Sequence, residues 1–509
     1  MLKAAAVGSV ALAAGSVLMR CAADSGRANN AALVPEAVGD ANAEWFMQRA
    51  HTLSGNKVLV SSDGSTRPTT TLASRVCFPR SAQDIADLIK STPATTPIAC
   101  VCGGRESSNA ATVAGSGAII LDMVHLKSIE FHHDSEGMLV TVGAGVVFRE
   151  LVEAVREKHG ALPVGTGPGV GVVGYIVNGG LSGYFSRRLG LLGQRVVRLT
   201  MVTAAGEIRV LTSEDPLLSV MMGAGSALGV VVDVTIRVAD ESIIQSAEQR
   251  VFVFETRSQA VEFSRGALRI LKEHVLGDDS VTMELVVTGT KALVVTIVFY
   301  DTFRGNAVEF VKRFEDLAAS AKLPMVAHSH WGSWYETAAA LWPVINGIKG
   351  DPLVMLFHCV GTKGIPGDSA LDYISDTMVA QAPLDEAEFS LVEIRALGGA
   401  AMKGKMLPSG NCHHAFFVDL VTMYDAKNKT VDERTTIVDL TKRVIDKART
   451  VGELSVDFSG THSQPDDVGA SAEARVIFGT QALAESVRAM KQQMDPNNRF
   501  RFHPFAKFV

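Results

Sequence analysis

A glycine-rich stretch in the first quarter of the chain holds residues that could do chemistry. The sequence "ACVCGGRESSNAA" (residues 99–111) is an apolar run followed by Gly103, Gly104 and Arg105. Glycine has no Cβ, so its backbone can approach a ligand closely. Consecutive backbone N–H groups in such loops form concave sites for anions. The stretch therefore predicts a loop that approaches a phosphate, with a guanidinium beside it.

Glycines gather again at three later places, namely residues 143–145, 164–196 and 223–225. One long ligand with a diphosphate, lying across several loops, would explain all four clusters, because each cluster can present consecutive N–H groups. The alternative is that the glycines serve ordinary turns.

One of these clusters, Gly169-Val-Gly171-Val-Val-Gly174, matches the G-x-G-x-x-G pattern of nicotinamide-type dinucleotide sites. That pattern needs a strand before it, a helix that opens on it and an acid about 20 residues further on. Here more glycines follow the motif, and the first acidic residue after Gly174 is Glu207. We therefore do not expect a dinucleotide site of that type.

Hydrophobic periodicity places these loops among short strands and helices. "RVCFPRSAQDIADLIKS" (residues 75–91) predicts a strand, a turn and a helix, with Ser81 as the helix N-cap. Residues 137–160 predict a strand, a glycine turn and an amphipathic helix that stops at Gly160. Residues 196–211 predict a hairpin that turns at an Ala-Gly pair.

From about residue 240 the pattern changes. "QRVFVFE" (249–255), "ALVVTIVFY" (292–300) and "AFFVDLVTMY" (415–424) predict long antiparallel strands, and helical segments at 307–321 and 436–449 lie between them. Strands that are distant in sequence and alternate with helices are typical of a sheet covered by helices. The fold class expected is α+β. The chain closes with a helix that ends before Pro496.

The composition indicates a chain with a large buried core. The chain has 509 residues, 47% of them hydrophobic, and a net charge of −6. The charge disfavours nucleic acid as a partner, because such surfaces need an excess of Lys and Arg. Cys100 and Cys102 are interpreted as small core residues on one side of a strand. They, the His132-His133 pair and His328-x-His330 lack a complete ligand set at recognisable spacing, so no metal is expected.

The N-terminus carries the one segment that resembles a targeting signal. Residues 4–19 are apolar, Lys3 precedes them, Arg20 follows them, and the first acid is Asp24. The apolar run is shorter than the ~20 residues that a spanning helix needs. We expect residues 1–27 to be a secretory signal, with a mitochondrial leader as the alternative.

The order of these segments resembles the FAD-linked oxidases of the vanillyl-alcohol-oxidase type, in the berberine-bridge-enzyme-like branch. The resemblance covers roughly residues 45–509 and rests on "CGGRESSNAA", "VTVGAGVVFRELVEAV", "LPVGTGPGVGVVGYIVNGGLSGYFSRRLGLL", "GAGSALGVVVDVTIRV", "EIRALGGA" and "DPNNRFRFHP". It implies a PCMH-type FAD-binding domain over 45–240 and a substrate-binding domain over 241–450. It also implies a C-terminal segment over 451–509 that returns to the FAD-binding domain.

The resemblance also implies which residues contact the cofactor. Arg105 stands where family members carry a histidine that holds the flavin covalently, and Gly167 stands where many carry a cysteine as a second tether. With both tethers absent, we expect FAD to be bound noncovalently. The residues expected at FAD are Gly103, Gly104, Arg105, Glu106, Ser107, Gly165, Gly174, Gly179, Gly180, Gly183, Gly229 and Val231.

Three further departures from the family bear on the site. A guanidinium at Arg105 could pair with phosphate or stabilise negative charge on the reduced ring, or it could point outward and pair with Glu106. Gln194-Arg195 replaces an Asp-Asn pair that helps lock the second glycine loop, which leaves the local geometry open. Phe458 stands at the place of a tyrosine whose hydroxyl in relatives can contact the flavin or aid the base.

Acid–base groups must then come from the substrate-binding block, because a general base needs reach to the substrate. The catalytic candidates are Glu393, His414 and Tyr424. The alternatives are a solvated or paired glutamate, a surface histidine pair with His413, and a tyrosine at the end of a core strand. "HWGSWYETAAALW" (residues 330–342) is either core or an aromatic pocket wall.

The function expected is an FAD-dependent oxidoreductase that oxidises a small organic alcohol, sugar or aromatic substrate. A hydride would pass to the flavin, a pocket base would take the proton, and dioxygen would be the acceptor. The alternative is a non-catalytic flavin- or ligand-binding protein of the same fold, which the loss of His, Cys and Tyr at three places supports. The retained glycine loops favour the enzyme.

Overall fold

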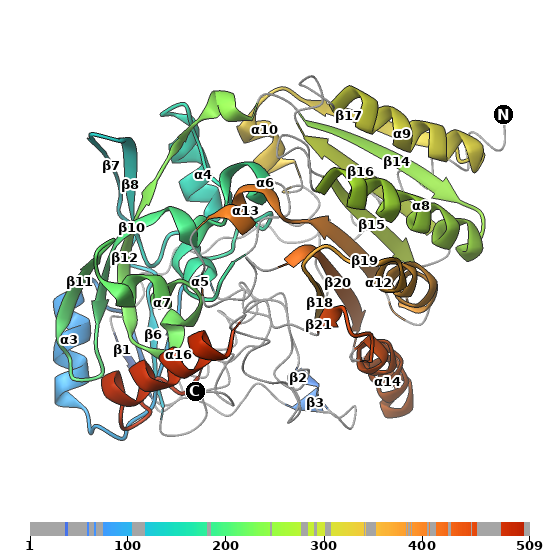
Figure 1. The fold of residues 1–509 in the computed structure, drawn as a ribbon. Helices are drawn as coiled ribbons and strands as arrows, with labels where there is room; N and C mark the ends of the chain where they lie inside the picture. The colour runs from blue at the N-terminus through green and yellow to red at the C-terminus, as the bar shows by residue number, and fades with distance from the viewer. Residues whose placement is uncertain are drawn as a thin grey trace, which may run out of the picture.

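The computed structural model describes the chain in segments. These are residues 36–38, 59–60, 66–67, 75–103, 118–180, 185–244, 247–275, 283–289, 293–300, 307–340, 342, 353–382, 384, 387, 389–404, 407, 414–425, 429–448, 450–455 and 480–502. Figure 1 shows two bodies side by side, which we call the N-terminal part (β1 and the elements from residue 75 to residue 244) and the eight-stranded part (residues 247–455).

The N-terminal part begins with a four-stranded sheet of order β1-β4-β6-β5. Its strands are β1 (Glu36–Val38), β4 (Arg75–Cys77), β5 (Ile98–Val101) and β6 (Ile119–Asp122). β4 and β5 both run parallel to β6, so α3 (Ala82–Ser91) connects β4 to β5. The Ser81 hydroxyl accepts a hydrogen bond from the Asp84 N–H at 3.1 Å, which confirms the predicted N-cap.

A second, antiparallel sheet of order β11-β10-β12-β8-β7 completes the framework of this part. Its strands are β7 (Ile129–Asp134), β8 (Gly137–Gly143), β10 (Val196–Val202), β11 (Ile208–Thr212) and β12 (Val230–Arg237). The predicted hairpin is confirmed, because β10 and β11 pair directly and Gly206 takes a positive φ of 76° in the turn.

Short helices fill the space around the two sheets. They are α4 (Phe148–Arg156), α5 (Val172–Val177), α6 (Ser186–Leu189) and α7 (Pro216–Ala224), with the 3-10 turns η1 (Leu192–Arg195), η2 (Gly225–Ala227) and η3 (Glu241–Ile243). Two small pairs, β2 (Leu59–Val60) with β3 (Thr66–Arg67) and β9 (Gly160–Ala161) with β13 (Ala239–Asp240), complete the list.

The end of α4 differs from the sequence-based prediction. The helix ends at Arg156, the chain turns through His159 with a positive φ of 54°, and Gly160 opens β9. A Cβ at Gly160 would lie 2.5 Å from the Val238 side chain. Glycine is therefore needed there for close packing against Val238 and not as a helix stop.

The eight-stranded part contains one antiparallel sheet of order β17-β14-β16-β15-β19-β20-β18-β21. Its strands are β14 (Ala247–Phe254), β15 (Met283–Gly289), β16 (Leu293–Tyr300), β17 (Met325–Trp331), β18 (Leu353–Lys363), β19 (Phe389–Ala396), β20 (His414–Asp425) and β21 (Leu454–Ser455). The three long strands predicted from sequence are β14, β16 and β20. The expectation of an antiparallel sheet covered by helices is confirmed.

Helices cover one face of this sheet (Figure 1). They are α8 (Arg257–Val275), α9 (Ala307–Ser320), α12 (Asp368–Tyr373) with the π-helical turn η4 (Ile374–Val379), and α14 (Val431–Ala448). Side chains from alternate strand positions, such as Val392 and Val418, share a buried core with Phe263, Phe310 and Ile374 of these helices. The intervening positions point to the other face, as the two-residue period of a strand requires.

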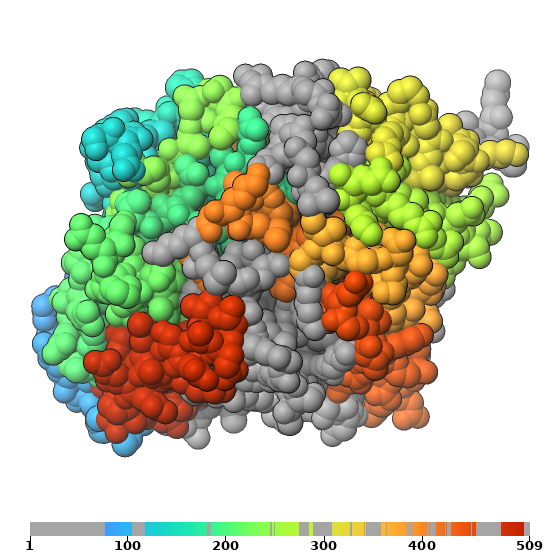
Figure 2. Space-filling model, viewed as in Figure 1, coloured from blue at the N-terminus to red at the C-terminus, as the bar shows by residue number. Residues whose placement is uncertain are grey.

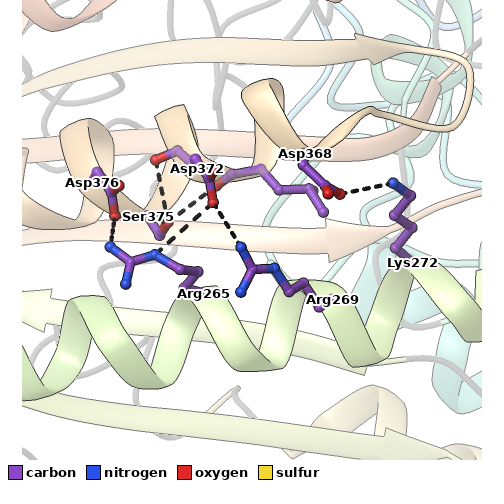
Figure 3. A network of polar contacts seen from close by, with 8 residues as sticks. Arg265, Arg269, Lys272, Asp368, Asp372, Ser375 and Asp376 are labelled. Carbon is purple, nitrogen blue, oxygen red and sulfur yellow. Dashed lines mark hydrogen bonds and ion pairs between the residues drawn. The ribbon is translucent and has the colours of Figure 1, made fainter.

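A row of ion pairs joins α8 to α12 and η4 (Figure 3). Arg265 lies 2.5 Å from Asp376, and Lys272 lies 3.1 Å from Asp368. The cations recur on one face of α8 because residues three and four apart are neighbours on a helix. The row lies along the exposed side of the contact between α8 and α12.

The last described segment of the chain returns to the N-terminal part. α16 (Gln481–Met494) lies against it in Figure 2, and the Ile98 N–H donates to the Arg499 carbonyl at 2.8 Å. The Arg499 guanidinium donates to the carbonyls of Ile89 and Ala204, both at 3.1 Å. Residues from the two ends of the chain thus share one body. No helix in the described segments is both long enough and apolar enough to cross a membrane.

Candidate active site and cofactor pocket

A cavity lies where β5, α5, the segment from η2 to the start of β12 and the C-terminal aromatic residues meet. Small residues line much of it: Ala99, Gly174, Gly225 and Gly229. A Cβ added to Gly174 would meet nothing nearer than the Cys102 side chain at 3.8 Å, so this glycine opens onto free space. The cavity therefore has room for a ligand beside the α5 backbone.

The polar groups on its wall come from two residues that bond to each other. The Ser226 hydroxyl donates to the Asn178 amide oxygen at 2.7 Å, and the Asn178 amide nitrogen donates to the Gly174 carbonyl at 2.9 Å. Among the described residues that line the cavity, none carries a charge, and Phe500 and Val231 add apolar surface. Such a wall fits an uncharged planar ring with hydrogen-bonding edges, as in the adenosine half of FAD.

Cys100 and Cys102 line this cavity together. Both side chains point to the same side, as predicted, and they pack against the hydrophobic core where it borders the cavity. Both are free cysteines, and neither is fully buried. Burial, and secondarily the neighbouring Cys102, raise the pKa of the Cys100 thiol far above its ordinary value. The group is therefore a neutral thiol.

Several glycines predicted at the cofactor are packed closely against other parts of the chain. A Cβ at Gly103 would lie 2.3 Å from the backbone nitrogen of Gly171, so the two loops touch backbone to backbone. A Cβ at Gly180 would lie 2.3 Å from the Tyr175 ring, and one at Gly165 would lie 3.1 Å from it. These three positions are small because other parts of the chain pack on them.

The remaining predicted cofactor residues divide into three groups. Gly174, Gly229 and Val231 line the cavity, whereas Gly179 follows α5 with a positive φ of 76°. The others lie outside the described residues: Gly104, Arg105, Glu106, Ser107 and Gly183.

A buried charge cluster lies on the sheet face that points away from the covering helices. Arg395 of β19 bonds to Glu393 and lies 2.8 Å from the Asp419 carboxylate of β20. The Cys359 thiol of β18 donates to the other Asp419 oxygen at 2.7 Å. The register places Asp419 beside Glu393 on one side and Cys359 on the other. Three neighbouring strands therefore bring the cluster together.

This cluster faces the N-terminal part. Cys359, Leu397 and Phe417, on the same sheet face, belong to the buried core of that part. Across the boundary lies Tyr175 of α5, whose hydroxyl is buried and has no hydrogen-bond partner among the described residues. Burial raises the pKa of the Tyr175 hydroxyl well above its ordinary value, although the positive charge of Arg395 opposes the shift. Tyr175 is a neutral phenol.

Electrostatics hold Arg395 in its charged form. Burial by itself would lower the pKa of the guanidinium, but Glu393 and Asp419 together hold it far above its usual range. The Asp419 side chain is fully buried, and 16% of the Glu393 side chain is exposed. Glu393 is therefore the less buried carboxylate of the pair.

The loop after α6 is fastened to the end of β19. The Gln194 amide nitrogen donates to the Ala401 carbonyl at 2.8 Å, and its oxygen accepts from the Leu191 N–H at 2.7 Å. Arg187 donates to the Leu397 carbonyl. α6 thereby packs on α13 (Gly399–Lys403), whose orange surface meets the green of the N-terminal part in Figure 2. The two hydrogen bonds of Gln194 thus hold the segment after α6 against α13.

The three predicted catalytic residues lie in three different places. Glu393 belongs to the charge cluster. His414 begins β20, is buried, and places its Nδ1 2.9 Å from the Thr362 carbonyl oxygen. Tyr424 packs with Ile437 and Val438 under α14, on the face of β20 opposite Asp419. Of these three residues, only Glu393 lies in the charge cluster. Phe458 and His413, which the sequence analysis also discussed, lie outside the described residues.

The cluster residues that sequence reasoning did not single out are Asp419, Arg395, Cys359 and Tyr175. A signal was available for Asp419, because it is the only charged residue inside the apolar run "AFFVDLVTMY". A charge in a strand whose neighbours are all apolar is costly to bury unless it is paired. Nothing in the sequence indicated which strands would supply its partners.

The aromatic segment at residues 330–342 joins the two parts. The Trp334 indole N–H donates to the Leu162 carbonyl at 2.9 Å, and Trp334 is buried. The Arg156 guanidinium of α4 lies 4.1 Å from the centre of the Tyr335 ring. α10 (Trp334–Ala339) therefore packs on α4 as part of the core.

His328 and His330 lie on β17, at an outer edge of the large sheet, and face the Glu248 carboxylate at 3.4 and 4.0 Å. That carboxylate is bonded to Arg250 at 2.6 Å. In the described segments, no group of three or more His, Cys, Asp or Glu side chains is arranged to hold a metal ion.

Comparison with known proteins adds a family and a fold. Residues 73–212 match the FAD binding domain family. The chain is 33% identical to (R)-6-hydroxynicotine oxidase of Paenarthrobacter nicotinovorans over 138 residues, which is 26% of this chain and 29% of that protein. The chain thus matches less than a third of the length of this curated relative.

Solved structures are similar over nearly the whole chain. Chitooligosaccharide oxidase superposes with a TM-score of 0.72 at 14% identity, covering 97% of this chain and 98% of that one. A variant of berberine bridge enzyme superposes with a TM-score of 0.72 at 17% identity, covering 96% and 98%. At these identities the likeness shows a shared fold.

Proposed function

Because the chain carries the FAD binding domain and has the fold of the berberine-bridge-enzyme-like FAD-linked oxidases, we propose that it oxidises a small organic alcohol, sugar or aromatic substrate. FAD is its cofactor. The observation that carries the proposal is the buried Glu393–Arg395–Asp419 cluster, which faces the part that contains the FAD binding domain. A relative named (R)-6-hydroxynicotine oxidase supports the reaction class, and a structural neighbour is named chitooligosaccharide oxidase.

The proposed roles follow from burial and charge. Oxidation of a C–OH or C–NH group removes a hydride and a proton, and bound FAD supplies the hydride acceptor. Glu393 takes the proton, because it is the less buried carboxylate of the pair and a positioned carboxylate can act as a general base. The neutral Tyr175 hydroxyl donates a hydrogen bond into the same region. Dioxygen is the proposed final acceptor.

The cofactor is proposed to be bound noncovalently. Gly174, Asn178 and Ser226 would hold its adenosine half in the cavity. The support is the absence from the sequence of the histidine and cysteine tethers, since Arg105 and Gly167 stand at their places. We also propose that residues 1–27 direct the chain to the secretory pathway, which a cleaved N-terminus in the exported protein would support.

The first experiment is an acid precipitation of the purified protein after its visible spectrum is recorded. A yellow protein that releases FAD into the supernatant supports noncovalent binding, and flavin that remains in the pellet contradicts it. A panel of neutral alcohols, reducing sugars and cyclic amines is then screened for peroxide formation in air. The variant Glu393→Gln should lose activity on every active compound, whereas His328→Gln, at the outer sheet edge, should retain it.

Two results would contradict the proposal. A colourless protein that takes up no added FAD would favour a ligand-binding protein without flavin chemistry. Full activity in Glu393→Gln would remove Glu393 from the reaction and leave Asp419 as the carboxylate to test.

A further inference from the structure

Three sulfur-containing side chains line the cavity together: Cys100, Cys102 and Met123. Cys100 belongs to β5, Cys102 directly follows that strand, and Met123 directly follows β6. The Met123 N–H donates to the Val101 carbonyl at 2.9 Å, so the contact between the two strands continues past their ends. The cysteine pair lacked a third ligand at recognisable spacing in the sequence, and the neighbouring strand supplies a thioether beside it.

Strand geometry orients the three side chains alike. Residues two apart on a strand point to the same face, which places Cys100 and Cys102 together. The parallel register of β5 with β6 ends at the pair Val101 and Asp122. The next pair is therefore Cys102 with Met123, and side chains paired across parallel strands point to the same face. Two thiols and a thioether thus belong to one wall.

The Cys102 sulfur faces the free space of the cavity. It lies 4.0 Å from the position of a Cβ added to Gly174, and no atom comes closer to that position than 3.8 Å. Neither Cys100 nor Cys102 is fully buried or part of a disulfide. An ion that enters the cavity beside Gly174 therefore comes within reach of the thiols.

The spacing of the two thiols favours a metal bridge over a disulfide. Side chains that project from residues two apart on a strand start about 6.6 Å from each other, whereas a disulfide needs Cβ atoms about 3.5–4.5 Å apart. A thiolate bond to a d¹⁰ ion is about 2.3 Å long, so one ion reaches two sulfurs up to about 4.6 Å apart. Each side chain then leans inward by about 1 Å, which a rotation at the side chain provides.

The chemistry of the donors selects the ion. Thiolate and thioether sulfurs are soft ligands, and a set that combines them favours Cu(I). Hard ions such as Mg²⁺ and Ca²⁺ take oxygen ligands, and none of the described residues that line the cavity carries a carboxylate. Burial raises the pKa of the Cys100 thiol, so an ion must displace a firmly held proton there. A soft ion that forms strong bonds to thiolate is therefore required.

We propose that Cys100, Cys102 and Met123 form a three-coordinate site for Cu(I) on the wall of the cavity. The site goes beyond the proposed oxidation, because it holds an ion and not a substrate. The adenosine half of FAD is proposed to occupy the same cavity, so copper and FAD should exclude each other. This exclusion rests on the proposed placement of FAD, whereas the metal site itself does not.

The test offers Cu(I), held by the coloured chelator bicinchoninate, to the full-length protein with reduced thiols and without oxygen. Flavin-free wild type should withdraw one equivalent of Cu(I), and X-ray absorption at the copper edge should show sulfur neighbours only. Cys100→Ser and Cys102→Ser should each weaken binding more than about a hundredfold, because even an outer-shell partner contributes about 10–100-fold. Met123→Leu, which nearly conserves volume, should weaken binding about tenfold and remove one sulfur neighbour.

Two variants control for the substitutions themselves. Cys77→Ser changes a buried cysteine of β4 that is not among the described residues lining the cavity. Met378→Leu changes a buried methionine in the helix-covered core of the eight-stranded part. Both should bind Cu(I) as wild type does. Thermal unfolding without metal shows which variants are folded, and an alanine variant, which buries no hydroxyl, replaces any serine variant that is not.

Cu(I) binding that survives in Cys102→Ser would overturn the inference, as would nitrogen among the copper neighbours. A copper spectrum of Met123→Leu equal to that of wild type would overturn the role of the thioether.

Saturation with FAD separates the metal site from the proposed function. FAD-loaded wild type should take up no Cu(I). Uptake beside bound FAD would support the metal site and contradict the placement of adenosine in this cavity. No uptake by the flavin-free protein would refute the metal site and leave the proposed oxidation standing.

Discussion

The Lys491 ammonium of α16 donates to the carbonyl of Ala227 at 2.8 Å, across a sequence separation of 264 residues. It also donates to the Asp495 carboxylate at 2.7 Å and to the Phe500 carbonyl at 3.0 Å. Lys491 is buried, and burial lowers its pKa despite the opposing carboxylate. Since Phe500 and the loop after Gly225 both line the cavity, one side chain holds two of its walls together.

Lys491→Met should therefore weaken both stability and FAD binding. Removing one partner of a buried ion pair costs about 3–5 kcal/mol, and the loop at Ala227 loses its anchor. Thermal unfolding of the apoprotein and FAD titration by flavin fluorescence measure the two effects. Lys312→Met is the matched control, because Lys312 forms the same i,i+4 pair with an aspartate on the surface. Unchanged FAD affinity in Lys491→Met would show that the ammonium does not shape the cavity.

Gly174→Val should fold normally and bind FAD at least tenfold more weakly. An added Cβ would meet no atom closer than 3.8 Å, so we expect the valine side chain to extend into the cavity that Gly174 lines. It then occupies volume that the adenosine half would need. Gly452→Val, at a position with nothing within 4 Å of an added Cβ, should leave FAD affinity unchanged. Equal affinities in the two variants would place the cofactor elsewhere.

Gly180→Ala should act on stability first. The new methyl group would lie 2.3 Å from the Tyr175 ring, and overpacking of this kind costs about 1–3 kcal/mol. Denaturant unfolding measures the loss. Adding Tyr175→Val should recover part of it, because the smaller side chain vacates the clash. Purely additive destabilisation in the double variant would contradict the packing relationship.

Asp134 and Arg237 should make a pH-dependent contribution to stability. The two Arg237 nitrogens donate to the Asp134 carboxylate at 2.8 and 2.7 Å. This hydrogen bonding, followed by that of the Glu136 N–H, holds the pKa of Asp134 well below its usual 3.8. A carboxyl whose pKa is lowered on folding stabilises the protein above the ordinary pKa and loses that effect as the pH falls towards the lowered one.

Asp134→Asn should accordingly have a lower melting temperature than wild type at neutral pH, and the gap should begin to narrow near about pH 4 and shrink further as the pH falls towards the lowered pKa. The pair is exposed, so salt should also narrow the gap. A gap that is constant across pH would mean that the pair does not contribute through its charge.

The ion pairs between α8 and α12 (Figure 3) should each contribute little and depend on salt. Exposed pairs contribute about 0.2–1 kcal/mol. A double-mutant cycle of Arg265→Gln and Asp376→Asn, run by denaturant unfolding, should give a coupling energy in that range. The coupling should fall in 1 M salt, where the screening length is about 3 Å. A coupling that salt does not change would contradict an electrostatic origin.

Local sequence was enough to predict several of the elements. The N-cap at Ser81, the hairpin at Gly206 and the strands β14, β16 and β20 all depend on interactions among residues that are near one another in the chain. Cys100 and Cys102 were placed on one side of a strand for the same reason. The family resemblance added the cofactor and the fold.

Only the tertiary structure decided whether a given residue of these elements borders a cavity or packs against another part of the chain. Glycine lacks a side chain in every context, so the sequence cannot distinguish Gly174, which opens onto a cavity, from Gly103 and Gly180, which pack on other parts of the chain. Gly160 was misread as a helix stop for the same reason.

The charge cluster shows the same division between local and long-range information. The sequence by itself determined that Glu393 and Asp419 lie on strands, because the two-residue period of apolar positions is local. Only the strand register decided that they lie side by side with Arg395 on the face toward the N-terminal part, while Tyr424 of the same strand lies on the other face. Register depends on contacts between segments far apart in the chain, and no local pattern encodes those contacts.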